Sequence, residues 1–232
     1  IKMVYHLFND KKKTVTITGS SGSLGYELAK KFNLNNYNLI LHTRKKSSKI
    51  LKFKGKNKSI ELVYGDLEKK KTIADITKLI SKSNFNIIIN NSGIYKNKPF
   101  NKCDLKDLKE IFDSNFFSNI YLLHNVIKKK LNNVLIININ SIAGINGTAN
   151  ESVYSASKHA LKGFYDSIEK EPNQNINFLN IFPGAFKSKI SKKRKDFQNL
   201  MEPEEIAEII YKSTQNYESL AISNIFLKRK KY

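Results

Sequence analysis

Several residue types are scarce in this chain of 232 residues, and each scarcity excludes a class of protein. A single cysteine, Cys103, excludes an internal disulfide and favours a reducing cytoplasm. No apolar run approaches the roughly 18 residues of a membrane-spanning helix, so we expect no membrane insertion. Acidic residues are also few, 20 against 41 basic ones. The remaining composition, 40% hydrophobic and 11% aromatic, is typical of a globular protein and too apolar for a disordered one.

The formal net charge of +21 raises the question of an anionic partner such as nucleic acid. However, only three basic residues are arginine, and the lysines occur in scattered runs without interleaved aromatic residues. We therefore interpret most of the charge as solvated surface and expect no nucleic-acid partner. An acidic carrier protein or a phosphorylated substrate stays open as an alternative.

Short apolar runs alternate with helical patterns along the chain. Strands are predicted at residues 15–18, 38–42, 60–64, 87–90, 134–140, 177–182 and 221–227. Helices are predicted at residues 24–32, 73–80, 105–131, 152–169 and 202–214. Nearly continuous apolar strands suit a parallel sheet that is buried on both faces. The alternation predicts an α/β fold, a Rossmann-type doubly wound parallel sheet of about seven strands in a single domain (14–232) after an N-terminal extension (1–13).

A glycine-rich segment, T-G-S-S-G-S-L-G, follows the first predicted strand and opens the first predicted helix. Gly19 suits a tight turn, Gly22 lets the backbone approach a phosphate, and Gly25 lets the helix pack closely. The helix N-terminus then presents free N–H groups to a pyrophosphate. In this strand–loop–helix context the motif predicts dinucleotide binding, although glycines also make ordinary turns.

The second predicted strand indicates which dinucleotide is bound. It ends in Thr43, Arg44 and Lys45, where NAD sites often carry an acid for the ribose 2′-hydroxyl. Arg44, helped by Lys45, can instead pair with a 2′-phosphate, because a guanidinium matches phosphate oxygens. We therefore favour NADP(H) over NAD(H), while a surface basic run is the alternative.

A Y-x-x-x-K pattern places Tyr154 and Lys158 on one face of a predicted helix. A nearby ammonium lowers the pKa of a phenol from its usual value of about 10, which would make Tyr154 a general acid or base. Such a pattern is frequent by chance in a lysine-rich chain. Two further polar residues support it: Ser141 follows a buried strand, and Asn115 lies on the inward face of a predicted helix. A satisfied core amide is the alternative for Asn115.

Together these residues resemble the short-chain dehydrogenase/reductase family, in its compact single-domain branch. The match extends from the glycine loop to Pro183 and Gly184. Asn115, Ser141, Tyr154 and Lys158 match the catalytic tetrad of that family in order and approximate spacing. The residues that the resemblance assigns to cofactor binding are Gly19, Ser21, Gly22, Ser23, Leu24, Gly25, Arg44, Lys45, Asp66, Leu67, Asn91, Ser92, Gly93, Asn115, Tyr154, Lys158, Pro183, Gly184 and Ser188. No metal site is expected.

The resemblance implies an NADP(H)-dependent oxidoreductase that acts on a small carbonyl or alcohol, as a homodimer or homotetramer. Tyr154 would exchange the proton, Ser141 would hold the oxygen, Lys158 would tune Tyr154, and Asn115 would anchor a water. The glycine spacing departs from the compact branch and resembles the larger sugar-nucleotide enzymes. A sugar or sugar-nucleotide oxidoreductase, a 3-oxoacyl-carrier-protein reductase and a non-enzymatic NADP(H) sensor therefore stay as alternatives.

The sequence does not identify the substrate. Two variable segments are expected to line its pocket, residues 142–151 and 184–201. Neither segment offers a carboxylate clamp, a metal cluster or another chemical signature. The second is polar, basic and weakly patterned, and it is the best candidate for a mobile lid.

Overall fold

The computed structural model describes residues 13–131, 133–171, 176–215 and 221–230. Within them, seven strands form one parallel sheet in the order β3-β2-β1-β4-β5-β6-β7. The strands are β1 (Thr14–Ile17), β2 (Asn38–Thr43), β3 (Ile60–Tyr64), β4 (Asn86–Asn90), β5 (Val134–Ile139), β6 (Ile176–Pro183) and β7 (Asn224–Leu227). This confirms the predicted Rossmann-type doubly wound sheet. The predicted extension at residues 1–13 lies, apart from Lys13, outside the described residues.

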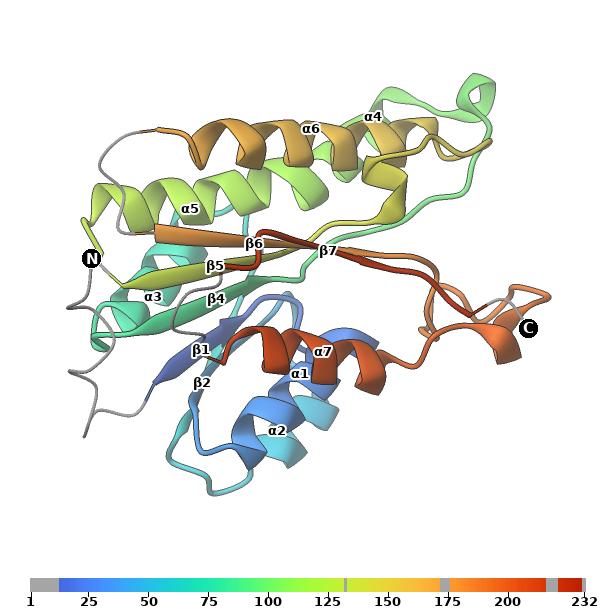
Figure 1. Cartoon of the computed structure of the whole chain (residues 1–232). Helices are drawn as coiled ribbons and strands as arrows, with labels where there is room; N and C mark the ends of the chain where they lie inside the picture. Colours follow the sequence, from blue (N-terminus) through green and yellow to red (C-terminus); the bar gives the residue numbers. More distant parts are fainter. Residues whose placement is uncertain (1–12, 132, 172–175, 216–220, 231–232) are drawn as a thin grey trace.

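Helices cover both faces of the sheet (Figure 1). One layer holds α1 (Ser23–Leu34), α2 (Ser48–Lys54) and α7 (Pro203–Ser213), and the other holds α3 (Lys70–Ile80), α4 (Leu105–Phe112), α5 (Ser118–Lys128) and α6 (Ser152–Ile168). Among the described residues, no helix has the length and apolar character needed to cross a membrane.

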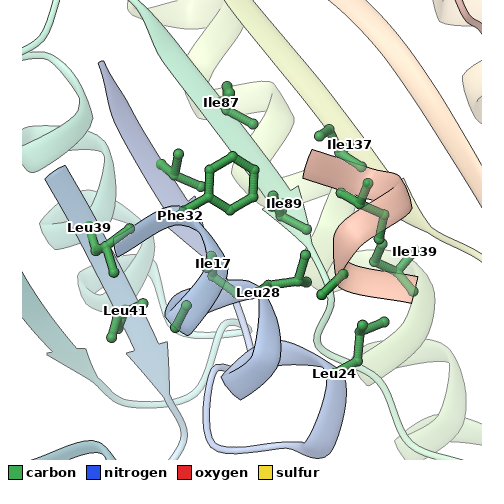
Figure 2. Close-up of a cluster of buried hydrophobic side chains, with 14 of the residues drawn as sticks. Ile17, Leu24, Leu28, Phe32, Leu39, Leu41, Ile87, Ile89, Ile137 and Ile139 are labelled. Carbon is green, nitrogen blue, oxygen red and sulfur yellow. The ribbon is translucent and has the colours of Figure 1, made fainter. Parts of the chain in front are cut away.

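Each helical layer encloses its own hydrophobic core. Under α1 and α7, Leu28, Phe32 and Ile210 are fully buried against the sheet. Figure 2 shows Phe32 and Leu28 lying over isoleucines of β1 and β4. On the opposite face, Leu161 and Tyr165 of α6 are fully buried with side chains of α3 and α5. Because both faces of the sheet are covered, side chains on both sides of the central strands are apolar, and the sequence of these strands is a continuous apolar run.

The prediction of one long helix at residues 105–131 is wrong in one respect, because the helix is interrupted. A π-helical turn, η2 (Asp113–Phe117), separates α4 from α5. Ser118 and Asn119 donate side-chain hydrogen bonds to the carbonyls of Ser114 and Asn115, at 2.7 and 2.8 Å. Bonding of this kind competes with the regular helical ladder, and π-turns often mark functional sites. Asn115 lies within this interruption, and its side chain is fully buried.

Other corrections are smaller. The last strand is shorter than the predicted 221–227, and α2 was not predicted. Helix α2 has only seven residues and fully buries only Ile50, so its apolar pattern is too short to predict a helix. Its only local signal is Ser47, whose hydroxyl accepts from the amide of Ile50 at 3.5 Å.

Candidate active site

A cleft of about 1080 Å³ opens at the carboxyl ends of the strands. It is centred on β1 and β4, where the strand order reverses. In open α/β sheets this switch point is where ligands bind, because the loops leave in opposite directions and a crevice forms between them. The volume is at the upper end of the range for ligand pockets, so it has room for an extended ligand.

The glycine loop forms one wall of the cleft. Gly19 has a φ of +65°, which favours glycine, and Gly22 is the residue that caps α1. A Cβ at Gly25 would lie 2.5 Å from the carbonyl oxygen of Gly19 and 2.8 Å from Asn91 Nδ2. The missing side chain therefore allows the first turn of α1 to pack against this loop and against the end of β4, as the motif predicted.

Asn91 fastens the glycine loop to β4. Its Nδ2 donates to the carbonyls of Thr18 and Gly19, at 2.9 and 3.2 Å. The Thr18 hydroxyl accepts from the amides of Asn91 and Ser92, both at 3.0 Å. These bonds connect the ends of β1 and β4 across the switch point, so the loop is held without any ligand.

The positive end of α1 faces the cleft without a counter-charge. Its capping residue, Gly22, supplies no side-chain hydrogen bond, and the first turn contains no acidic residue. Ser23, Leu24 and Gly25 of this turn all line the cleft. Free N–H groups and the helix dipole at such an end favour an anion.

The proposed catalytic side chains converge on the opposite side of the cleft. Tyr154 and Lys158 lie one turn apart on α6, and Ser141 follows β5. The Ser141 hydroxyl accepts from the amide of Ala143 at 3.1 Å, which orients it. Lys158 is only 5% exposed, and its Nζ donates to the carbonyl of Ile139 at 3.0 Å.

The pKa of Tyr154 differs from the expectation. Burial raises it to about 12, although a hydrogen bond with Ser141 opposes the rise. Burial also lowers the pKa of Lys158 to about 8, because the charged ammonium is removed from water. In the free protein the pKa of Tyr154 is therefore raised and not lowered as expected, and burial is the main cause. Tyr154 is protonated at neutral pH and can act as a general acid.

Asn115 lies behind the cleft and does not line it. Its side chain is fully buried and bonds to both backbone groups of Ile94, accepting from the amide at 2.7 Å and donating to the carbonyl at 2.9 Å. It also donates to the Ser157 hydroxyl at 3.1 Å. The side chain thus braces the segment after β4 against α6. A water anchored by Asn115 stays a prediction.

Most of the predicted cofactor residues line the cleft, with Lys45 and Asn115 as the exceptions. The lining set comprises Gly19, Ser21, Gly22, Ser23, Leu24, Gly25, Arg44, Asp66, Leu67, Asn91, Ser92, Gly93, Tyr154, Lys158, Pro183, Gly184 and Ser188. Arg44 extends from the end of β2, whereas the exposed Lys45 lies outside.

Several lining residues were not singled out from the sequence. They include His42, Tyr95, Glu151, Lys193 and Arg194. His42 is buried and hydrogen-bonds to the carbonyl of Gly65 at 2.8 Å, and burial lowers its pKa. Tyr95 and Glu151 contact each other from separate loops. Glu151, Lys193 and Arg194 lie in the two segments that were expected to line the pocket, residues 142–151 and 184–201, whereas no motif or expected segment contains His42 or Tyr95.

The comparisons with known proteins agree with this geometry. Residues 13–199 match the family model for short chain dehydrogenases, so the chain belongs to the short-chain dehydrogenase/reductase family. A mouse dehydrogenase/reductase SDR family member 7 is 30% identical over 194 residues, covering 77% of this chain and 56% of the mouse protein. The chain thus spans little more than half of that relative.

Two further similarities cover nearly the whole chain. The 3-oxoacyl-[acyl-carrier-protein] reductase of Buchnera aphidicola is 29% identical over 231 residues, covering 95% of this chain and 91% of that protein. The solved structure of 4-hydroxyisoleucine dehydrogenase complexed with NADH has a TM-score of 0.82 at 20% identity, covering 94% of this chain and 98% of the other. At that identity the structural likeness supports the fold alone.

Proposed function

We propose that this protein is an NADP(H)-dependent oxidoreductase that interconverts a carbonyl compound and an alcohol. The observation that carries the proposal is the convergence of Ser141, Tyr154 and Lys158 on one cleft with the glycine loop. A cofactor site and a proton donor then face the same space, which is what hydride transfer to a carbonyl requires.

The residues present fit a nicotinamide dinucleotide. The first turn of α1 offers N–H groups without a competing acid, which suits a pyrophosphate. Gly93 and Lys158 lie beside each other, with 3.9 Å from Lys158 Nζ to the place of a Cβ on Gly93. Asp66 and Leu67 line the cleft after β3, and Pro183, Gly184 and Ser188 line it after β6.

The bound cofactor supplies the hydride, and the protein supplies position and a proton. Tyr154 donates its proton to the substrate oxygen as the carbonyl is reduced, since burial keeps the phenol protonated at neutral pH. Ser141 hydrogen-bonds the same oxygen and orients it. Lys158, placed one turn along α6, stabilises negative charge on Tyr154 when an alcohol is oxidised instead.

The preference for NADP(H) over NAD(H) is supported by Arg44. It lines the cleft at the end of β2, where the sequence Thr43, Arg44, Lys45 carries no acid for a 2′-hydroxyl. A guanidinium gives charge-assisted hydrogen bonds to a 2′-phosphate, worth about 1.5–3 kcal/mol.

The test is a fluorescence titration of NADPH and NADH against the wild type, Arg44→Ala and the matched control Lys45→Ala. We expect Arg44→Ala to weaken NADPH binding by roughly 10–100-fold and to leave NADH binding unchanged. Lys45→Ala should change little, because Lys45 does not line the cleft. Equal weakening of both cofactors by Arg44→Ala would refute the NADP(H) preference, and binding of neither by the wild type would refute the enzyme.

A 3-oxoacyl-carrier-protein reductase is the second candidate. It is favoured by the Buchnera relative, which matches this chain over nearly the full length of both proteins. Consumption of NADPH with acetoacetyl carrier protein, at a kcat/KM well above that with a free acetoacetyl thioester, would support this candidate. Equal values for both substrates would count against it.

We also propose a homo-oligomer, assembled through the end of η2 and the start of α5. Phe117 and Tyr121 are 38% and 43% exposed, and their rings stack with centroids 6.0 Å apart. Exposed aromatic pairs of this kind mark interaction surfaces. Light scattering at micromolar concentration should report a dimer or tetramer.

A cytoplasmic location is consistent with the free, half-buried Cys103, and fractionation of the source cells would test it.

A further inference from the structure

Two side chains of opposite charge line the substrate end of the cleft, and the mechanism above uses neither. Glu151 comes from the loop that leads into α6, and Arg194 comes from the segment after β6. The sequence does not indicate that Glu151 and Arg194 lie close together, because they are 43 positions apart along the chain.

Glu151 is held next to the reacting centre. The Tyr95 hydroxyl donates to Glu151 Oε1 at 2.5 Å, and the Tyr95 ring packs edge-on against the Tyr154 ring, with centroids 5.0 Å apart. The carboxylate therefore shares a wall with the hydroxyl of Tyr154. Its charge adds to burial in raising the pKa of Tyr154.

Arg194 is oriented by a carboxylate of its own. Asp196 accepts from Arg194 Nε at 2.9 Å and from Nη2 at 3.1 Å. Arg229, from the segment after β7, also donates to Asp196, at 2.8 Å. One carboxylate is thus shared by two guanidinium groups, so the trio has a net charge of +1. Lys193 lines the cleft beside it.

The use of arginine is itself informative. Only three of the 41 basic residues are arginine, so composition strongly favours lysine. Arg44 and Arg194 nevertheless line the two ends of the cleft, and Arg229 is joined to Arg194 through Asp196. A planar guanidinium differs from an ammonium in binding a carboxylate through two parallel bonds. In Arg194 the Nε–Nη2 edge already binds Asp196, which leaves the Nη1–Nη2 edge for an anionic group in the cleft.

Glu151 and Arg194 line the same cleft. Hydrogen bonding to Asp196 raises the pKa of Arg194, and the charges of Tyr95 and Glu151 raise it further. We propose that the substrate is a small zwitterion, an alcohol or carbonyl compound whose ammonium group binds Glu151 and whose carboxylate binds Arg194. This inference rests on the proposed function and specifies its substrate class. In the oxidation direction the alcohol carbon loses a hydride to the nicotinamide and the hydroxyl loses a proton to the phenolate form of Tyr154, which leaves a carbonyl.

Three matched alcohols test the inference with purified protein and either NADP⁺ or NAD⁺. L-Serine carries both charged groups, 3-hydroxypropanoate lacks the ammonium, and 2-aminoethanol lacks the carboxylate. We expect kcat/KM for L-serine to exceed that of each truncated alcohol by about 10-fold or more, because each loses one charge-assisted contact.

Two variants should change these preferences separately. Glu151→Gln should abolish the preference for L-serine over 3-hydroxypropanoate and keep the preference over 2-aminoethanol. Arg194→Gln should do the reverse. Lys195→Gln is the matched control, since it removes an exposed cation from the same segment and Lys195 does not line the cleft. A crossed pattern of this kind would not arise from general destabilisation.

The outcomes separate this inference from the proposed function. Equal kcat/KM for the three alcohols, or faster reduction of the uncharged ketone ethyl acetoacetate in a separate assay with NADPH or NADH, would overturn the inference while the enzyme stands. Cofactor binding without turnover of any of these four compounds would also overturn it. Failure to bind either cofactor would refute the proposed function itself.

Discussion

The ring of Tyr95 meets the ring of Tyr154 edge-on, with centroids 5.0 Å apart and planes at 83°. Tyr95 lies in the segment after β4, and Tyr154 lies in α6. This segment is fastened by Lys96 and Lys98, which both donate to the carboxylate of Asp107 in α4. The proposed proton donor is thus supported by a loop that is itself anchored to a helix on the same face of the sheet.

Removing the Tyr95 ring should therefore affect the chemical step. Edge-on aromatic pairs are worth about 0.5–1.5 kcal/mol, so we expect Tyr95→Ala to lower kcat by roughly 2–10-fold. Tyr95→Phe keeps the ring and loses the bond to Glu151, so it should raise KM and leave kcat nearly unchanged. Steady-state kinetics with the best available substrate distinguish the two effects. Equal effects of both substitutions on kcat would contradict the role of the ring.

The hydroxyl of Tyr154 should dominate activity. Tyr154→Phe removes a general acid, which typically lowers the rate by about 10²–10⁴-fold, while cofactor affinity should stay within a factor of about two. Tyr211→Phe is the control, because Tyr211 lies on α7, does not line the cleft, and loses only a surface hydrogen bond to Asn35. Turnover of Tyr154→Phe near the wild-type rate would remove Tyr154 from the mechanism.

The direction of the pKa shift of Tyr154 predicts a pH dependence. Because burial raises the pKa to about 12, the phenolate needed for alcohol oxidation is scarce at neutral pH. We expect the oxidation rate to rise steadily between pH 7 and pH 10, and the reduction rate to show no such rise. Initial rates in both directions across this interval provide the measurement. An oxidation rate independent of pH would indicate another base.

Lys158 should lower the stability of the free protein. Its pKa is lowered from 10.5 to about 8 by burial, which corresponds to about 3 kcal/mol. Between these two values the unfolded chain binds a proton that the folded chain does not, so the contribution of Lys158 to stability rises with pH. Lys158→Met should therefore increase the free energy of unfolding at pH 7 and remove activity.

The control for this experiment is Lys162→Met, on the same helix, where Lys162 pairs with Asp166 at the surface. Urea unfolding at pH 7 and pH 10, without cofactor, gives the comparison. The stability difference between the wild type and Lys158→Met should shrink at pH 10, whereas the difference for Lys162→Met should stay small. A difference for Lys158→Met that is the same at both pH values would contradict the buried ammonium.

Two glycine-to-alanine substitutions should have opposite effects. At Gly25 the new Cβ would lie 2.5 Å from the carbonyl oxygen of Gly19 and 2.9 Å from Ser20 Cα, so backbone must move. We expect a loss of about 1–3 kcal/mol and much weaker cofactor binding. At Gly163 in α6 nothing lies within 4 Å of the new Cβ, so Gly163→Ala should stabilise the protein by about 0.5–1 kcal/mol. Thermal unfolding and NADPH titration measure both effects, and unimpaired cofactor binding by Gly25→Ala would contradict the close packing.

The sequence alone determined the order of the strands and of every helix except α2 along the chain, because apolar periodicity and glycine positions are local signals. It also located the glycine loop, Ser141, Tyr154 and Lys158, whose spacing reflects one strand end and one helical turn. The bonds of Asn115 to Ile94 and Ser157 could not be predicted in this way, because these partners come from other parts of the chain.

Only the tertiary structure decided the protonation of the site and the composition of its substrate end. The pKa values of Tyr154 and Lys158 depend on how much water the surrounding elements exclude, and burial reversed the expectation drawn from their spacing. Glu151, Tyr95 and Arg194 lie on three separate loops, and they share a cleft because parallel strands deliver their following loops to one edge of the sheet. No local pattern encodes that proximity, since it is a property of the strand order and not of any segment.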